Sequence, residues 1–127
     1  MLAQPLPKDC FLQQIAVADI GAFAAHVFEN REDMLGKRVE LAGGELAGRH
    51  VATALTIFRR ETVEYQQVPL EQIRAFSEDM ALMYEWFEKG GYQVDVDSLR
   101  TTYPDIGWHG YIDWLAELDE GVFSPQD

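Results

Sequence analysis

The chain has 127 residues and a formal net charge of −12 at pH 7, with 47% hydrophobic and 12% aromatic residues. This apolar content excludes a chain that is disordered throughout, and the length suits a single domain over residues 1–127. The charge is uneven, because residues 71–127 carry thirteen acids against three bases, which gives −10. An acidic surface repels phosphate groups, so neither nucleic acids nor anionic membranes are expected partners.

The sequence shows no sign of export or membrane insertion. No apolar run approaches the roughly 20 residues that a membrane-spanning helix needs. The first ten residues, MLAQPLPKDC, have no basic stretch followed by an apolar one. Cys10 is the only cysteine, which excludes an internal disulfide. Together these features predict a cytoplasmic protein.

The first part of the chain predicts a strand that leads into a helix. Residues 1–10 contain two prolines and predict an extended lead-in, and residues 12–17 alternate as a strand does. Asp19 then stands where a helix N-cap is expected. The polar run 29–33 and Gly36 mark the end of the helix. Its buried stripe is predicted from apolar residues three or four positions apart: Ile20, Phe23, Ala24, Val27 and Phe28.

Two further strands and one helix are predicted before residue 69. The strands cover residues 38–41 and 62–68, and residues 42–45 form the loop after the first of them. A helix is predicted over residues 47–59. Its buried stripe comprises Val51, Ala54, Leu55 and Phe58.

Residues 69–89 predict the longest helix of the chain. Pro69 suits its first turn, where the missing N–H costs no hydrogen bond, and Gly90-Gly91 stops it. Leu82 and Trp86 lie beside the main apolar stripe and give the helix a second apolar flank. Two apolar sides indicate that one side packs on the core and the other lines a ligand pocket or meets a partner. The main stripe comprises Ile73, Phe76, Met80, Met83, Tyr84 and Phe87.

The C-terminal part predicts two more helices and a frayed acidic tail over residues 120–127. Asp97 is expected to cap a short helix through Thr102, which ends at Tyr103-Pro104. The last helix is predicted from Trp108, Tyr111, Ile112, Leu115 and Leu118. The order β-α-β-α-β-α-α-α predicts an α/β fold with a small, three-stranded, mainly parallel sheet and about five helices.

The histidines offer a weak case for a metal site. His109 and Asp113 lie four apart on the last predicted helix, with Asp105 nearby, as two ligands of one helix face can. No third ligand has a matching spacing, because His26 and His50 lie on other helices. Surface or helix-terminal roles are favoured for these groups, and no metal is expected.

Two other arrangements suggest chemistry and have simpler explanations. Cys10 follows Lys8 closely, and a nearby cation stabilises a thiolate, but no helix N-terminus or histidine supports it, so an inert cysteine is favoured. Four carboxylates of the long helix could act in acid–base pairs, but they lie where its solvated face is expected. These four are Glu78, Asp79, Glu85 and Glu88. No catalytic residue is therefore assigned.

The preferred functional residues are apolar side chains of the long helix. Thioethers and flat rings suit adaptable binding, either as the wall of a pocket for a small apolar ligand or as an interface. Ordinary core packing is an equally weighted alternative. The candidates are Phe76, Met80, Met83, Tyr84, Trp86 and Phe87.

Three segments resemble NmrA-like proteins, which are atypical relatives of the short-chain dehydrogenases/reductases. They are QQIAVADIGAF, KRVELAGGELAG, and the block from MALMYEWF through GYQVDVDSLRTTYPDI. The likeness covers residues from about 6 to 118 and implies the C-terminal substrate lobe, which in the family follows a Rossmann domain that binds NAD(P). The family tends to cap the second helix with Thr or Ser, and this chain has Ala47 there, a loss on the order of 1 kcal/mol.

The motifs that would bind a dinucleotide do not occur in this sequence. No G-x-G-x-x-G is present, and Gly43, Gly44 and Gly48 lack its spacing. The superfamily's Y-x-x-x-K pair is also lacking, because Glu88 stands four residues after Tyr84. The resemblance therefore implies no cofactor for this chain alone, and NAD(P) only together with a Rossmann partner or an upstream domain.

The sequence thus predicts a non-catalytic binding or interaction module that forms a homo-oligomer or completes a nucleotide-binding partner. Two alternatives stay open. In the first, the chain is a fragment or split subunit of an NAD(P)-dependent reductase or of an NAD(P)-sensing regulator. In the second, it is a free-standing binder of a small molecule.

Overall fold

A computed structural model describes residues 1–118 of the protein. Within them lie four short strands, seven α-helices and one 3-10 helix, and the predicted α/β class is confirmed. The predicted tail over residues 120–127 falls outside this range. None of the helices in residues 1–118 has the length and apolarity that crossing a bilayer requires.

The strands form two separate two-stranded sheets, which corrects the expectation of one three-stranded sheet. β1 (Leu2–Gln4) pairs in parallel with β4 (Tyr65–Gln67), and β2 (Phe11–Gln14) pairs antiparallel with β3 (Gly44–Ala47). β1 lies in the predicted lead-in. It ends before Pro5, which has no N–H to continue a ladder.

Two predicted strands shift in the structure. β2 stops short of residue 17, because Val17 already begins a helix. Residues 38–41 form no strand, and Arg38 and Glu40 instead make an exposed ion pair at 2.8 Å. β3 forms a few residues later, from the second half of the predicted loop 42–45 to Ala47, because that segment is the one that pairs with β2. The predicted strand over 62–68 is confirmed at its centre by β4.

The first predicted helix is confirmed as α1 (Val17–Glu29), followed by the single turn of α2 (Arg31–Met34). Its predicted buried stripe is wrong in part, because Ile20, Ala24 and Phe28 are exposed. Its N-cap is Ala16, not Asp19. Asp19 lies within the first turn and is 1% exposed, because its carboxylate has a distant partner that is described below. The predicted cap position is therefore wrong.

The second helix is confirmed as α3 (Gly48–Arg59). Ala47 is its N-cap and offers no side-chain acceptor, as expected. The ring of His50 contributes at this end instead, because its Nδ1 accepts the backbone N–H of Ala47 at 3.2 Å. This bond is the return half of a capping box, so the helix begins at the predicted position although Ala47 offers no side-chain acceptor.

The predicted long helix over residues 69–89 is two helices, α4 (Leu70–Phe76) and α5 (Glu78–Glu88). Ser77 separates them with an extended backbone, φ −155° and ψ 120°. Its hydroxyl accepts the backbone N–H of Met80 at 3.3 Å. Serine is a favourable N-cap, so Ser77 ends α4 and caps the start of α5.

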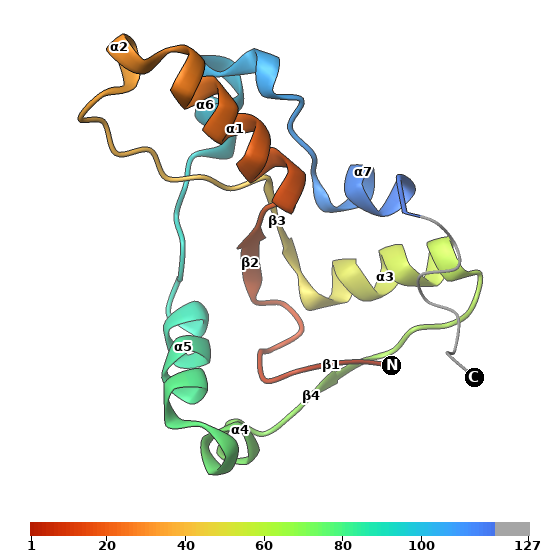
Figure 1. Ribbon diagram of the computed structural model, residues 1–127. Coiled ribbons are helices and arrows are strands. Elements are labelled where there is room, and N and C mark those ends of the chain that lie inside the picture. Colours follow the sequence, from red (N-terminus) through yellow and green to blue (C-terminus); the bar gives the residue numbers. More distant parts are fainter. Residues whose placement is uncertain (119–127) are drawn as a thin grey trace.

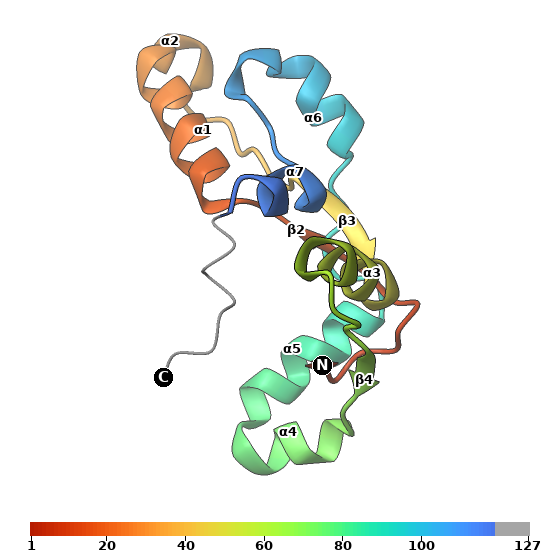
Figure 2. The same ribbon diagram turned by 90° about the vertical axis from the view of Figure 1, so that its right-hand side faces the viewer.

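Arg74 ties the two helices together by donating to both Glu78 and Glu85. α5 stops as predicted at Gly90 and Gly91, whose φ angles of 132° and 57° favour glycine. Figures 1 and 2 show α4 and α5 at the opposite end of the molecule from α1 and α2, with β2 and β3 between them.

The short helix α6 (Val96–Thr102) is confirmed, but its cap differs from the prediction. Asp95 is the N-cap, and its Oδ1 accepts the backbone N–H of Ser98 at 3.0 Å. Asp97 lies in the first turn. Tyr103-Pro104 ends the helix as expected and leads into the 3-10 helix η1 (Pro104–Ile106).

The last helix, α7 (Tyr111–Ala116), is shorter than predicted, and Trp108 lies before it. Trp108 instead packs with Phe23 of α1, and Phe23 also meets the ring of Tyr103 edge-on at 5.0 Å. The Trp108 indole N–H donates to the Tyr103 carbonyl at 2.8 Å. These rings hold α1 against the segment that precedes α7.

The core of the described residues is small. Apart from Asp19, its members include five alanines and six larger side chains: Leu6, Phe23, Met34, Val63, Leu99 and Leu115. Many large apolar side chains lie outside it, including Phe28, Ile57 and several residues of α5. Single exposed apolar residues are normal, but a small core beside many of them indicates surface that association would cover.

Gly43 is the point where three segments meet beside β3. Its N–H donates to the Gln14 carbonyl at 2.7 Å, and its carbonyl accepts from Arg100 Nη2 at 2.6 Å. A Cβ at this position would lie 2.5 Å from the backbone oxygen of His109. The glycine is thus required by close backbone approach.

We expect Gly43→Ala to destabilise the protein by roughly 1–3 kcal/mol, because two backbone segments would have to separate. Gly44→Ala is the matched control, since its Cβ would meet only Gly110 Cα at an ordinary 3.8 Å. Urea unfolding followed by circular dichroism measures both. Equal stability of the two variants would contradict the close approach.

Candidate functional site

A cavity of about 480 Å³ lies where the end of β2, β3 and α7 meet. This volume falls in the range of small-molecule sites. Most of the lining is apolar, and the polar side chains at its wall are few. The lining residues are Gln14, Ile15, Ala16, Val17, Gly44, Leu46, His109, Gly110, Tyr111 and Trp114.

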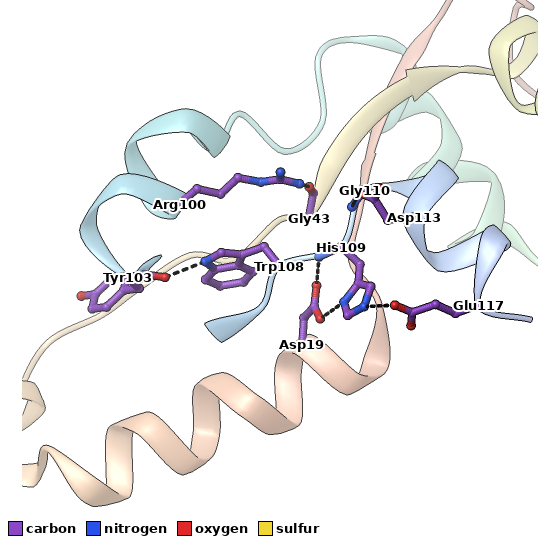
Figure 3. A network of polar contacts seen from close by, with 9 residues as sticks. All are labelled: Asp19, Gly43, Arg100, Tyr103, Trp108, His109, Gly110, Asp113 and Glu117. Atoms are coloured by element: carbon purple, nitrogen blue, oxygen red, sulfur yellow. Dashed lines mark hydrogen bonds and ion pairs between the residues drawn. The ribbon is translucent and has the colours of Figure 1, made fainter. Parts of the chain in front are cut away.

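His109, at the wall of this cavity, is held between two carboxylates (Figure 3). Its Nδ1 lies 2.6 Å from Asp19 Oδ1, and its Nε2 lies 2.9 Å from Glu117 Oε1. The backbone N–H of His109 also donates to Asp19 Oδ2 at 2.7 Å. Both oxygens of the buried carboxylate are therefore used, and they join α1 to the segment before α7.

The two carboxylates favour the charged imidazolium. The hydrogen bond to Asp19 is the largest cause that raises the pKa of His109, and the bond to Glu117 raises it further. An imidazolium donates at both ring nitrogens, whereas the neutral ring donates at only one. The cation also neutralises Asp19, whose charge would otherwise be buried alone.

This arrangement shares the Asp–His pair of a catalytic triad but not its nucleophile. A triad needs a nucleophile on one nitrogen of the histidine, and here a carboxylate occupies each side. The geometry supports binding and orientation by His109, not proton abstraction. Arg100, also drawn in Figure 3, donates to the carbonyl of Gly43, the residue before β3, and so links α6 to the start of that strand.

The residues predicted from the sequence lie elsewhere, on α4 and α5. They do not line this cavity. Phe76, Met80, Met83 and Trp86 are exposed, while Tyr84 and Phe87 are half-buried and stack edge-on with ring centroids 5.9 Å apart. Their role as ligand wall or interface stays a prediction.

The alternatives for Cys10 and the helix carboxylates have local explanations. Burial, and then the charge of Glu88, raise the pKa of the Cys10 thiol, which opposes an activated thiolate. Glu78 and Glu85 bind Arg74. They act between helices and do not form a free acid–base pair.

The spacing that suggested a metal site does not bring its members together. His109 turns to Asp19 and Glu117, whereas Asp113 Oδ2 accepts the backbone N–H of Gly110 at 2.9 Å. Within residues 1–118, no three His, Cys, Asp or Glu side chains are placed to hold a metal ion.

Sequence reasoning missed the roles of Asp19 and Glu117. One signal was available for Asp19, which precedes the buried Phe23 by four residues and so shares its apolar helix face. An acid on that face needs a buried partner. For Glu117 no local signal exists, because the bond to His109 depends on the path of the chain around α7.

Residues 1–117 match the sequence profile of the NmrA-like family, so the chain belongs to this family. No curated protein sequence matches the chain at a significant level. Membership indicates a protein related to nucleotide-binding regulators and reductases. Within residues 1–118, the small α/β fold, the apolar cavity and the exposed apolar side chains of α5 are the features from which a function is argued.

We expect Asp19→Ala to destabilise the protein by about 2 kcal/mol, because the His109 backbone N–H would lose its charged acceptor. Asp97→Ala is the control, as Asp97 is exposed in the first turn of α6 and does not cap it. The midpoint of urea unfolding reports both. A control variant as unstable as Asp19→Ala would refute the assignment.

The stability should also depend on pH through His109. Its folded-state pKa is raised, so its stabilising contribution is fully present below the ordinary value of about 6.5 and is lost as pH rises through the raised value. The free energy of unfolding should therefore fall above pH 6.5 in the natural protein. His109→Gln should lack this component, and parallel pH profiles of the two proteins would contradict it.

Proposed function

We propose that this chain is the substrate lobe of an NmrA-like protein, non-catalytic alone, which completes a nucleotide-binding Rossmann domain. That domain is either a separate subunit or a part of a longer chain. The lobe docks through the outer face of α5, defined as Met80, Leu82, Met83 and Trp86. The single observation that carries the proposal is that all four of these large apolar side chains are exposed.

The direction of the apolar side is unusual for a surface helix. Such a helix normally turns its apolar stripe to the core and its charges to water. In α5 the fully buried residue is the small Ala81, while Leu82 and Trp86 are 50% and 47% exposed. Two of the acids, Glu78 and Glu85, bind Arg74 at the junction with α4. Methionine and aromatic residues are enriched at the centres of protein interfaces.

The need for a partner also follows from the small core. The described residues bury few large side chains, and a docked domain would supply the missing burial, at about 25 cal/mol per Å² of apolar surface. The same partner would supply the glycine-rich turn that holds a pyrophosphate, which this sequence lacks. NAD(P) is thus proposed as a ligand of the complex only.

Two further functions have support of their own. Family membership favours a complex that acts as an NAD(P)-dependent reductase or an NAD(P) sensor, and NADPH oxidation by the assembled complex distinguishes these. The cavity beside α7 favours a free-standing small-molecule binder. Self-association through the α5 face is the other form that docking can take.

Titration calorimetry with NADPH tests the main proposal. The chain alone should not bind tightly, whereas the chain together with the nucleotide-binding domain encoded upstream or in a neighbouring gene should bind. Light scattering of the chain alone reports self-association. A monodisperse monomer that fails to associate with any such domain, or tight NADPH binding by the chain alone, would overturn the proposal.

The double variant Leu82→Gln/Met83→Gln should weaken docking tenfold or more, about 1.4 kcal/mol, because it places two amides at the centre of the interface. Ile57→Gln on α3 is the matched control, since Ile57 is 73% exposed and lies off α5. Analytical ultracentrifugation measures the association. Equal weakening by both changes would show that the α5 face has no special role.

A further inference from the structure

Nε2 of His109, the ring nitrogen that is not bound to Asp19, contacts a carboxylate whose side chain can move away into solvent. The inner partner, Asp19, is fully buried and also accepts the His109 backbone N–H. The outer partner, Glu117, has a side chain that is 67% exposed and lies just past the end of α7. Water can solvate that carboxylate as soon as it leaves, so the Nε2 contact costs little to break.

The cavity beside His109 suits the apolar body of a ligand. Ile15, Val17 and Leu46 contribute aliphatic surface, and Trp114 contributes a flat ring. Few polar groups face the space, and His109 is the one with a charge-assisted hydrogen-bond donor. A ligand that fills the cavity would therefore present one polar group to that ring.

The charges define what this polar group is. In the imidazolium form, which the charge of Asp19 neutralises, Nε2 carries an N–H that is directed at the Glu117 carboxylate. A carboxylate on the ligand would reproduce the contact that Glu117 makes now. Glu117 then acts as an internal stand-in for the ligand.

We propose that this cavity binds an aromatic or otherwise apolar monocarboxylate, whose carboxylate replaces Glu117 at Nε2 of His109. The site is formed by the β2–α1 junction, β3 and α7, and α5 contributes nothing to its lining. This inference is therefore independent of docking through the α5 face, and each can fail without the other.

Binding should follow the protonation of His109, because the neutral ring has no second N–H for the carboxylate. Affinity is expected to be full below pH 6.5 and to fall as pH rises through the raised pKa of this histidine. Charged or titratable side chains of α1, α6 and α7, and of the residues just past their ends, surround His109. They are Asp19, Arg100, Tyr111, Asp113 and Glu117.

The probes for the experiment are 2-naphthoate and its neutral amide, 2-naphthamide, titrated into the full chain at pH 6. Salt at 0.15 M screens the long-range repulsion by the net charge of −12. Glu117→Gln should raise the affinity for naphthoate roughly two- to fivefold, because the competing charge is gone. Glu71→Gln removes one charge from the exposed side of α4 and should change nothing.

Nitrogen-15 NMR locates the ligand, since the indole N–H of Trp114 should shift and that of Trp86 should not. Both glutamate positions are exposed, so the variants should fold, and circular dichroism checks this. Three results would each overturn the proposal: amide and acid binding equally, Glu117→Gln binding naphthoate no better than Glu71→Gln, or no shift at Trp114.

Discussion

The buried carboxylate of Asp19 joins two parts of the chain that are 90 residues apart. It holds α1 against the segment before α7, and His109 of that segment lines the cavity. The ring of His109 is the charge partner of this buried carboxylate. The same contact therefore joins the two segments and places a hydrogen-bonding imidazole at the cavity wall. One side chain thus contributes both to the stability of the fold and to the wall of the cavity.

Helices could be predicted where a local repeat decides the structure. The apolar spacing of α1 and α3 identified both, and paired glycines marked the end of α5. The strands were harder, because segments of three or four residues carry little alternation and their partners are distant in sequence. The extended lead-in became a strand only because residues 65–67 lie beside it.

The candidate site divides in the same way. The apolar residues of α5 were visible as a second flank of a helix, which is a local pattern. The cavity was not, because its walls come from three separated segments, residues 14–17, 44–46 and 109–114. The helix break at Ser77 shows a related limit. A serine can continue one helix or cap the next, and here Ser77 caps α5, whose first turn is bound to α4 through Arg74 and Glu78.

The pairing of β1 with β4 also determines when this chain can fold during its synthesis. Leu2 leaves the ribosome well before its partner Tyr65, and Asp19 leaves well before its partner His109. Closing such long loops is slow compared with forming a helix. The nascent chain should therefore carry α1 and α3 as transient local helices, with its N-terminal strand unpaired and open to chaperones until Gln67 has appeared.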